Sequence, residues 1–76
     1  MRQDAERIVE EYSDLVLRLA FSYLHSVHDA KDICQDVLLK LLMRDEPFDE
    51  MQHEKAWVIR VTVNMCKNEL ASARRN

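Results

Sequence analysis

The apolar residues of the chain recur at helical spacing in three segments, which two short polar stretches separate. In the first segment, residues 3–24, they recur every three or four residues and define one face of an amphipathic helix. Asp4 and Glu6 suit its first turn, where negative charge opposes the helix dipole. The side chains expected to face inward are Ile8, Tyr12, Leu15, Val16, Leu19 and Tyr23.

Residues 27–44 form the second predicted helix. Ser26 followed by Asp29 is a capping-box pattern that marks its start. Pro47 ends it, because proline lacks the N–H that a helix needs, and it lies within an acidic turn. The side chains expected to face inward are Ala30, Ile33, Cys34, Val37, Leu38, Leu41 and Leu42.

The third predicted helix begins between Glu50 and Glu54 and runs to about Arg75. Four apolar residues at i, i+4, i+7 and i+11 predict its core-facing stripe, namely Ile59, Val63, Cys66 and Leu70. The sequence therefore predicts an all-α fold, a compact three-helix bundle around one core. With 76 residues and 9.0 kDa, the chain has room for one small domain.

Composition narrows the classes of function. The chain has no glycine, which excludes Gly-rich phosphate loops and the nucleophile elbow. No arrangement of residues suits catalysis, and no cofactor is expected. Cys34 and Cys66 do not form a disulfide framework, so a reduced, cytoplasmic setting is expected. No segment has the apolar length to span a membrane. His25 and His28 with distant cysteines are a weak zinc pattern, and no metal is expected.

Charge is distributed unevenly along the chain. The net charge is −3, yet residues 55–76 hold five basic side chains and one acidic side chain. Cations neutralise phosphates and Asn pairs with base edges, so one polar face of the third helix is a candidate nucleic-acid surface. An ordinary solvated face fits the spacing equally well. This polar stripe consists of Arg60, Asn64, Lys67, Asn68, Ala71, Arg74 and Arg75.

Two further sets of residues are compatible with more than one role. Phe48 and Trp57 flank the start of the third helix, where an aromatic ring can stack on an unpaired base or pack in the core. Asp32, Gln35 and Asp36 share the outer face of the second helix. Their spacing does not separate a protein-docking patch from solvated surface.

Three stretches of the chain together resemble one known family. DAKDICQDVLLKLL resembles the A-E-D-x-x-Q-[DE] helix in the second conserved region of bacterial RNA polymerase sigma factors. EKAWVIRVTVNMCKNELASARR resembles the following W-[LV]-x-R-[IV]-x-x-N helix of the extracytoplasmic-function group, and EEYSDLVLRLAFSYL resembles the helix that precedes both. The resemblance covers residues 8–76, nearly the whole chain.

The resemblance implies a promoter-melting domain and no enzyme activity. Asp32, Gln35 and Asp36 match the motif that docks on the β′ clamp helices of the polymerase core. The loop before the third helix would hold a flipped base of the non-template −10 strand, with Phe48 near that base. Asn64 matches a base-recognition position. Trp57, Arg60, Lys67, Asn68, Arg74 and Arg75 complete the expected DNA surface.

The resemblance also implies an anti-sigma factor as a partner. The family's helix-turn-helix domain is absent from these residues, which we interpret as an excised domain or a truncated chain. An alternative is a degenerate sigma-like module that binds proteins and does not read promoter DNA, an interpretation that the acidic turn motivates. A small metal-dependent enzyme is the remaining alternative.

Overall fold

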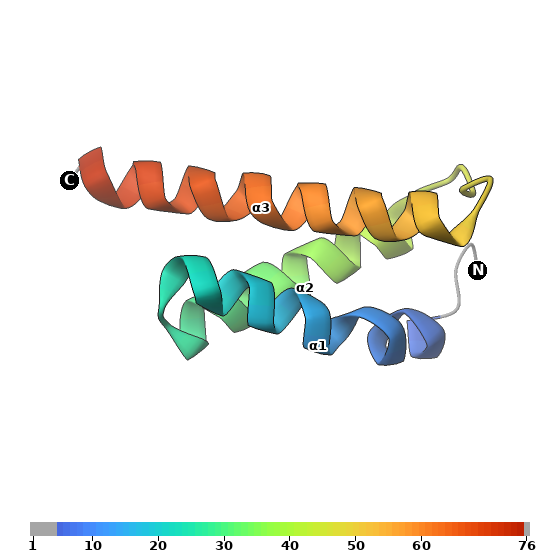
Figure 1. The fold of residues 1–76 in the computed structure, drawn as a ribbon, viewed down its shortest axis with the longest axis horizontal. Coiled ribbons are helices and arrows are strands. Elements are labelled where there is room, and N and C mark those ends of the chain that lie inside the picture. Colours follow the sequence, from blue (N-terminus) through green and yellow to red (C-terminus); the bar gives the residue numbers. More distant parts are fainter. Residues whose placement is uncertain (1–4, 76) are drawn as a thin grey trace.

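A computed structural model of the chain describes residues 5–75, with the side chains of 5–73, and shows three helices. Helix α1 covers Ala5–Leu24, α2 covers Val27–Met43, and α3 covers Met51–Arg75. Helix α2 returns beside α1, and α3 runs along both in the same direction as α1 (Figure 1). The predicted compact all-α fold is confirmed, with helix boundaries within two residues of those expected. Residues 3 and 4 of the first predicted helix lie outside the described residues.

The turn between α1 and α2 is closed by hydrogen bonds that the sequence specifies. The Asp29 backbone N–H donates to Ser26 Oγ at 3.2 Å, which confirms the predicted helix cap. His25 precedes it with φ of 55°, a left-handed conformation that favours glycine, which this chain lacks. The His25 N–H donates to the Phe21 carbonyl at 2.8 Å and ends α1. The turn thus forces α2 back along α1.

The core is built mainly between α1 and α2. The inward residues predicted for the second helix are buried, except that Leu42 is partly buried. In α1 the buried side chains form a single row at i+4 steps along the helix. Leu15, Leu19 and Tyr23 lie outside this row and are only half-buried. Its buried residues are Ile8, Tyr12, Val16 and Ala20, of which the small Ala20 was not predicted.

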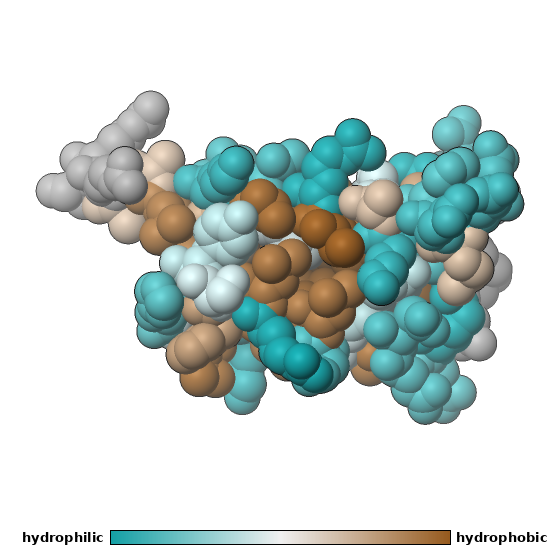
Figure 2. Space-filling view, viewed as in Figure 1, coloured by the Kyte–Doolittle hydropathy of each residue, from teal (hydrophilic) through white to brown (hydrophobic). Residues whose placement is uncertain are grey.

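The predicted core stripe of the third helix is wrong except at Cys66. The buried side chains of α3 lie at successive i+4 steps and are Glu54, Val58, Thr62 and Cys66. Ile59 and Val63 lie on the flank of this line and are half-buried. Figure 2 shows apolar surface between α3 and α1 in this region. Leu70 is 36% exposed, because the last turns of α3 extend past the other two helices (Figure 1).

A buried carboxylate fixes the rotation of α3. Glu54 is 4% exposed and accepts hydrogen bonds from both terminal nitrogens of Arg7, at 3.1 and 2.9 Å. Tyr12 Oη donates to Glu54 Oε1 at 2.6 Å. Burial raises the pKa of Glu54, but the hydrogen bonds from Arg7 and Tyr12 lower it by a larger amount. The net pKa of Glu54 therefore lies below the ordinary value of a glutamate. Glu54 is therefore a buried structural acid that joins α3 to α1.

Candidate functional site

The polar stripe of α3 faces away from the core, as its spacing predicts. Every side chain of the stripe within residues 60–71 is exposed, namely Arg60, Asn64, Lys67, Asn68 and Ala71. The structure describes Arg74 and Arg75 as part of α3, but their side chains lie outside the described ones. The stripe thus presents two cations and two amides to solvent over three turns of one helix.

Phe48 and Trp57 meet at the start of α3 and enclose a third side chain. Their ring centroids lie 5.9 Å apart with the planes tilted by 58°. The Arg44 guanidinium carbon lies 4.2 Å from the Phe48 centroid and 5.3 Å from the Trp57 centroid. We call these three residues the aromatic–arginine cluster. The sequence analysis missed Arg44, although a cation within four residues of an aromatic ring was a usable signal.

The aromatic–arginine cluster and the amides of the stripe share one side of α3. Trp57 and Asn64 are seven residues apart, two full turns, so their side chains point in nearly the same direction. Asn68 follows one turn later. The Arg44 Nε atom is buried and has no hydrogen-bond partner among the described residues. A single nucleic-acid strand that lay along the Asn64 and Asn68 side chains would also reach the aromatic–arginine cluster.

The loop before α3 borders a hollow of about 220 Å³. Its walls carry an aromatic ring, a proline and three carboxylates; they are Pro47, Phe48, Asp49, Glu50, Met51 and Glu54. Asp49 and Glu50 are exposed, whereas Glu54 is committed to Arg7 and Tyr12. Carboxylates accept hydrogen bonds and repel phosphate, so the hollow suits a group with N–H donors better than a phosphate.

The predicted docking residues lie together on the outer face of α2. Asp32, Gln35 and Asp36 are all exposed. Leu39 and Met43 continue the same face and are 55% and 63% exposed. An acidic and amide patch therefore lies next to two exposed apolar side chains on this face of α2.

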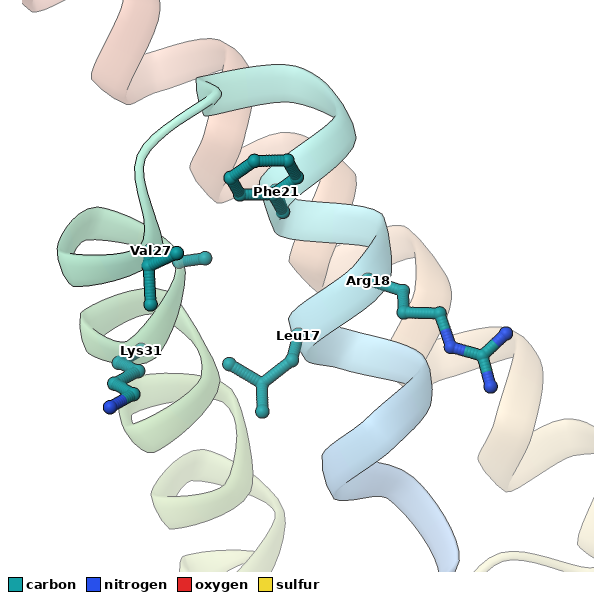
Figure 3. Close-up of a pocket in the computed structure, with 6 residues that line it drawn as sticks. Leu17, Arg18, Phe21, Val27 and Lys31 are labelled. Carbon is teal, nitrogen blue, oxygen red and sulfur yellow. The ribbon is translucent and has the colours of Figure 1, made fainter.

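An apolar hollow of about 450 Å³ opens beside this face, between α1 and α2. Figure 3 shows Leu17 and Phe21 of α1 opposite Val27 and Lys31 of α2. Phe21 is 44% and Val27 59% exposed. Lys31, which borders the hollow, lies one helical turn from Gln35 of the docking residues.

His25 and His28 make contacts with residues one turn away in the sequence. His25 packs edge-on against Phe21, with ring centroids 6.2 Å apart. His28 Nε2 lies 3.6 Å from Asp32 Oδ2 one turn along α2. Ligand atoms of His28, Asp29 and Asp32 lie within 4.8 Å of one another, a proximity that their positions i, i+1 and i+4 on an exposed turn produce without a metal.

Comparison with known proteins defines the family. A family model described as sigma-70 region 2 matches residues 8–76. The chain is 29% identical over 58 residues to the "ECF RNA polymerase sigma factor SigW" of Bacillus subtilis (strain 168). That match covers 76% of this chain and 31% of the relative, so the chain spans about a third of the relative's length. No solved structure matches the chain.

The chain therefore belongs to the sigma-70 region 2 family, the class of domain that its three-helix fold and its motifs predict. Sigma factors are transcription initiation factors and not enzymes. The family therefore confirms the prediction from the sequence that this domain is not an enzyme. None of the three described helices is long and apolar enough to cross a membrane.

Proposed function

We propose that this domain docks on the β′ clamp helices of the RNA polymerase core and captures a flipped non-template base of the −10 promoter element. The same proposal has three further parts. Residues 1–76 form one sigma region 2 domain, this domain acts in the cytoplasm, and an anti-sigma factor regulates it. The observation that carries it is the single side of α3 on which Trp57, Asn64 and Asn68 align.

Phosphate attraction supplies the first part of promoter binding. Arg60 and Lys67 are exposed on α3, and no acid separates them on that face. Each phosphate contact releases counterions, which makes binding independent of sequence and sensitive to salt. The rest of the chain is acidic, so the isolated domain binds weakly and the polymerase supplies further contacts. Arg74 and Arg75 extend the same role in this proposal.

Base contacts supply the second part. The Asn64 amide donates to and accepts from one base edge, and such a bidentate pair discriminates by about 1–3 kcal/mol. A base stacked on an aromatic ring gains about 1–3 kcal/mol, and extruding it costs a few kcal/mol. Phe48 and Trp57 supply the stacking surface. Together these contacts offset the cost of extrusion, so capture needs no chemistry on the DNA.

The outer face of α2 is the polymerase-docking surface of the proposal. Asp32, Gln35 and Asp36 supply polar contacts to the clamp helices, and Leu39 and Met43 supply apolar area. The neighbouring α1–α2 hollow accepts an apolar side chain of the same partner. Helix-on-helix recognition uses anchors at this spacing.

A second candidate is a sigma-like module that binds proteins and does not read DNA. Four exposed acids of the loop favour it, because they repel phosphate; they are Asp45, Glu46, Asp49 and Glu50. In the first candidate these acids face bases and not the backbone of the strand. The two candidates therefore differ in whether α3 binds single-stranded DNA.

The fluorescence of Trp57, the single tryptophan of the chain, tests the difference. Single-stranded oligonucleotides carrying many −10 sequences are titrated into the domain. We expect quenching that saturates and that Arg60→Ala and Asn64→Ala each weaken about tenfold, a loss of about 1.4 kcal/mol. Lys40→Ala on α2 is the matched control and leaves the titration unchanged. Absence of quenching at every sequence contradicts DNA reading and favours the second candidate.

Docking is measured separately with purified polymerase core. Asp32→Ala, Gln35→Ala and Asp36→Ala weaken core binding, and Glu46→Gln in the loop is the control acid. Each variant keeps the fold, because each side chain is exposed. If none of the three substitutions alters binding to the polymerase core, the α2 docking surface is contradicted. This conclusion does not depend on the DNA result.

A further inference from the structure

The hollow of about 220 Å³ before α3 adjoins the aromatic–arginine cluster, because Phe48 belongs to both. Phe48 is half-buried, so part of its side chain remains accessible. Arg44, whose guanidinium lies over the same ring, is not among the residues that line the hollow. A planar group that enters the hollow therefore contacts an aromatic side chain and stays next to the cluster.

The charged groups in the wall of the hollow are all hydrogen-bond acceptors. Asp49, Glu50 and Glu54 contribute carboxylates, and the lining residues include no lysine or arginine. Asp49 is exposed and makes no hydrogen bond or ion pair with another described residue. Glu50 accepts from Gln52 Nε2 through its Oε1 atom, and no described residue donates to its Oε2 atom. Two of the three carboxylates thus keep acceptor oxygens for a ligand.

The four DNA bases differ in what they offer to such acceptors. Adenine carries an amino group at N6, cytosine at N4 and guanine at N2, and an Asp or Glu carboxylate pairs with the amino group of cytosine. Thymine has no amino group and presents the acceptor oxygens O2 and O4. Two acceptors that meet without a donor lose their hydrogen bonds to water and gain none in return. A wall of carboxylates therefore separates amino-bearing bases from thymine.

We propose that this hollow selects a base with an exocyclic amino group and rejects thymine, with Asp49 and Glu50 as the specificity-determining residues. The base lies against Phe48, and its amino group donates to the two carboxylates. This inference rests on the proposed function, in which the loop captures a flipped base, and adds the kind of base that is taken. The same carboxylates repel phosphate, so they favour entry of the base edge over entry of the strand backbone.

Cytosine and thymine give the sharpest comparison, because both are pyrimidines and only cytosine has an amino group. Labelled oligonucleotides of about twelve thymidines carry one central cytosine or none. Fluorescence anisotropy is measured with the whole chain, alone and with purified polymerase core, and core alone is the blank. We expect about tenfold tighter binding of the cytosine oligonucleotide. One central deoxyuridine binds as thymidine does, which excludes the thymine methyl group as the cause.

The double variant Asp49→Asn, Glu50→Gln keeps the size of both side chains and replaces one acceptor of each by an N–H₂ donor. It is expected to reduce the cytosine preference to about twofold or less. Glu46→Gln is the matched control, because Glu46 is an exposed acid of the same loop and does not line the hollow. Each substitution removes one negative charge and strengthens binding of every oligonucleotide alike. The ratio of cytosine to thymine binding is therefore the readout.

Binding without a difference between cytosine and thymine, or a difference that the double variant retains, overturns the selection and leaves base capture intact. Absence of binding by every oligonucleotide overturns base capture and the selection together. If an arginine-rich peptide then binds and the double variant releases it, the hollow belongs to a basic segment of a partner protein. Circular dichroism verifies the fold of the double variant. Asp49→Asn alone keeps the test decisive if that variant does not fold, because Asp49 is exposed.

Discussion

Removing one hydroxyl group from the Arg7–Tyr12–Glu54 network is expected to destabilise the domain strongly. Tyr12 is 2% exposed, and its Oη donates to the buried Glu54 carboxylate at 2.6 Å. Tyr12→Phe keeps the ring in the core and deletes this hydrogen bond to a charged group, at a cost of about 1.5–3 kcal/mol. In a domain of this size 1 kcal/mol lowers Tm by about 4–8 °C. A fall in Tm of at least about 6 °C follows.

Thermal unfolding followed by circular dichroism measures the fall, and Tyr23→Phe is the matched control at a half-buried tyrosine of the same helix. Glu54→Gln extends the test to pH. The folded-state pKa of Glu54 lies below the ordinary glutamate value of about 4.3, so its contribution is full above that value and is lost as pH falls through the folded pKa. The difference in stability between wild type and Glu54→Gln therefore shrinks below about pH 4. Equal Tm values for Tyr12→Phe and Tyr23→Phe at pH 7 would refute the role of the network.

Three further outcomes are expected. Arg44→Met, which keeps the length of the side chain and removes its charge, shifts the emission of Trp57, because the guanidinium lies over the ring; unchanged emission contradicts the cluster. Ser26→Ala costs about 1 kcal/mol in urea unfolding, because the cap of α2 loses its acceptor, whereas Ser72→Ala on the exposed end of α3 is neutral. Cys34 and Cys66 react slowly with a thiol reagent in the folded state, because burial removes them from solvent and raises the pKa of each thiol, and rapid reaction without denaturant would show that they are accessible.

Helical periodicity was sufficient to predict α1, α2 and most of their shared core, because both helices bury an apolar face. In α1 it missed Ala20, which is buried. It failed on α3, where the buried line includes Glu54 and Thr62. Thr62 is satisfied within its own helix, since its Oγ1 donates to the Val58 carbonyl at 2.7 Å. Glu54 is satisfied by Arg7 and Tyr12, more than forty residues away. A contact between residues so far apart in the sequence does not affect the spacing of apolar residues within one helix. Periodicity therefore cannot predict it.

The candidate site was predictable where a pattern along one helix defines it. The exposure of Arg60, Asn64, Lys67 and Asn68 follows from their common face of α3. The association of Arg44 with Phe48 and Trp57 depends on how the loop folds back on α3, and loop conformation has no periodic signal. Ile59 and Val63 have the spacing of core residues, yet they lie on the flank of the buried side chains of α3 and are only half-buried.

The most direct test of promoter reading is selection from a library of single-stranded −10 sequences in the presence of polymerase core. Wild-type domain and Asn64→Ala are compared at equal concentration, and bound strands are sequenced. Enrichment of one short motif, weakened by Asn64→Ala while core binding is unchanged, is the result we expect. Core binding without any enrichment in the wild type would contradict base capture by α3 and leave a domain that docks on polymerase without reading DNA.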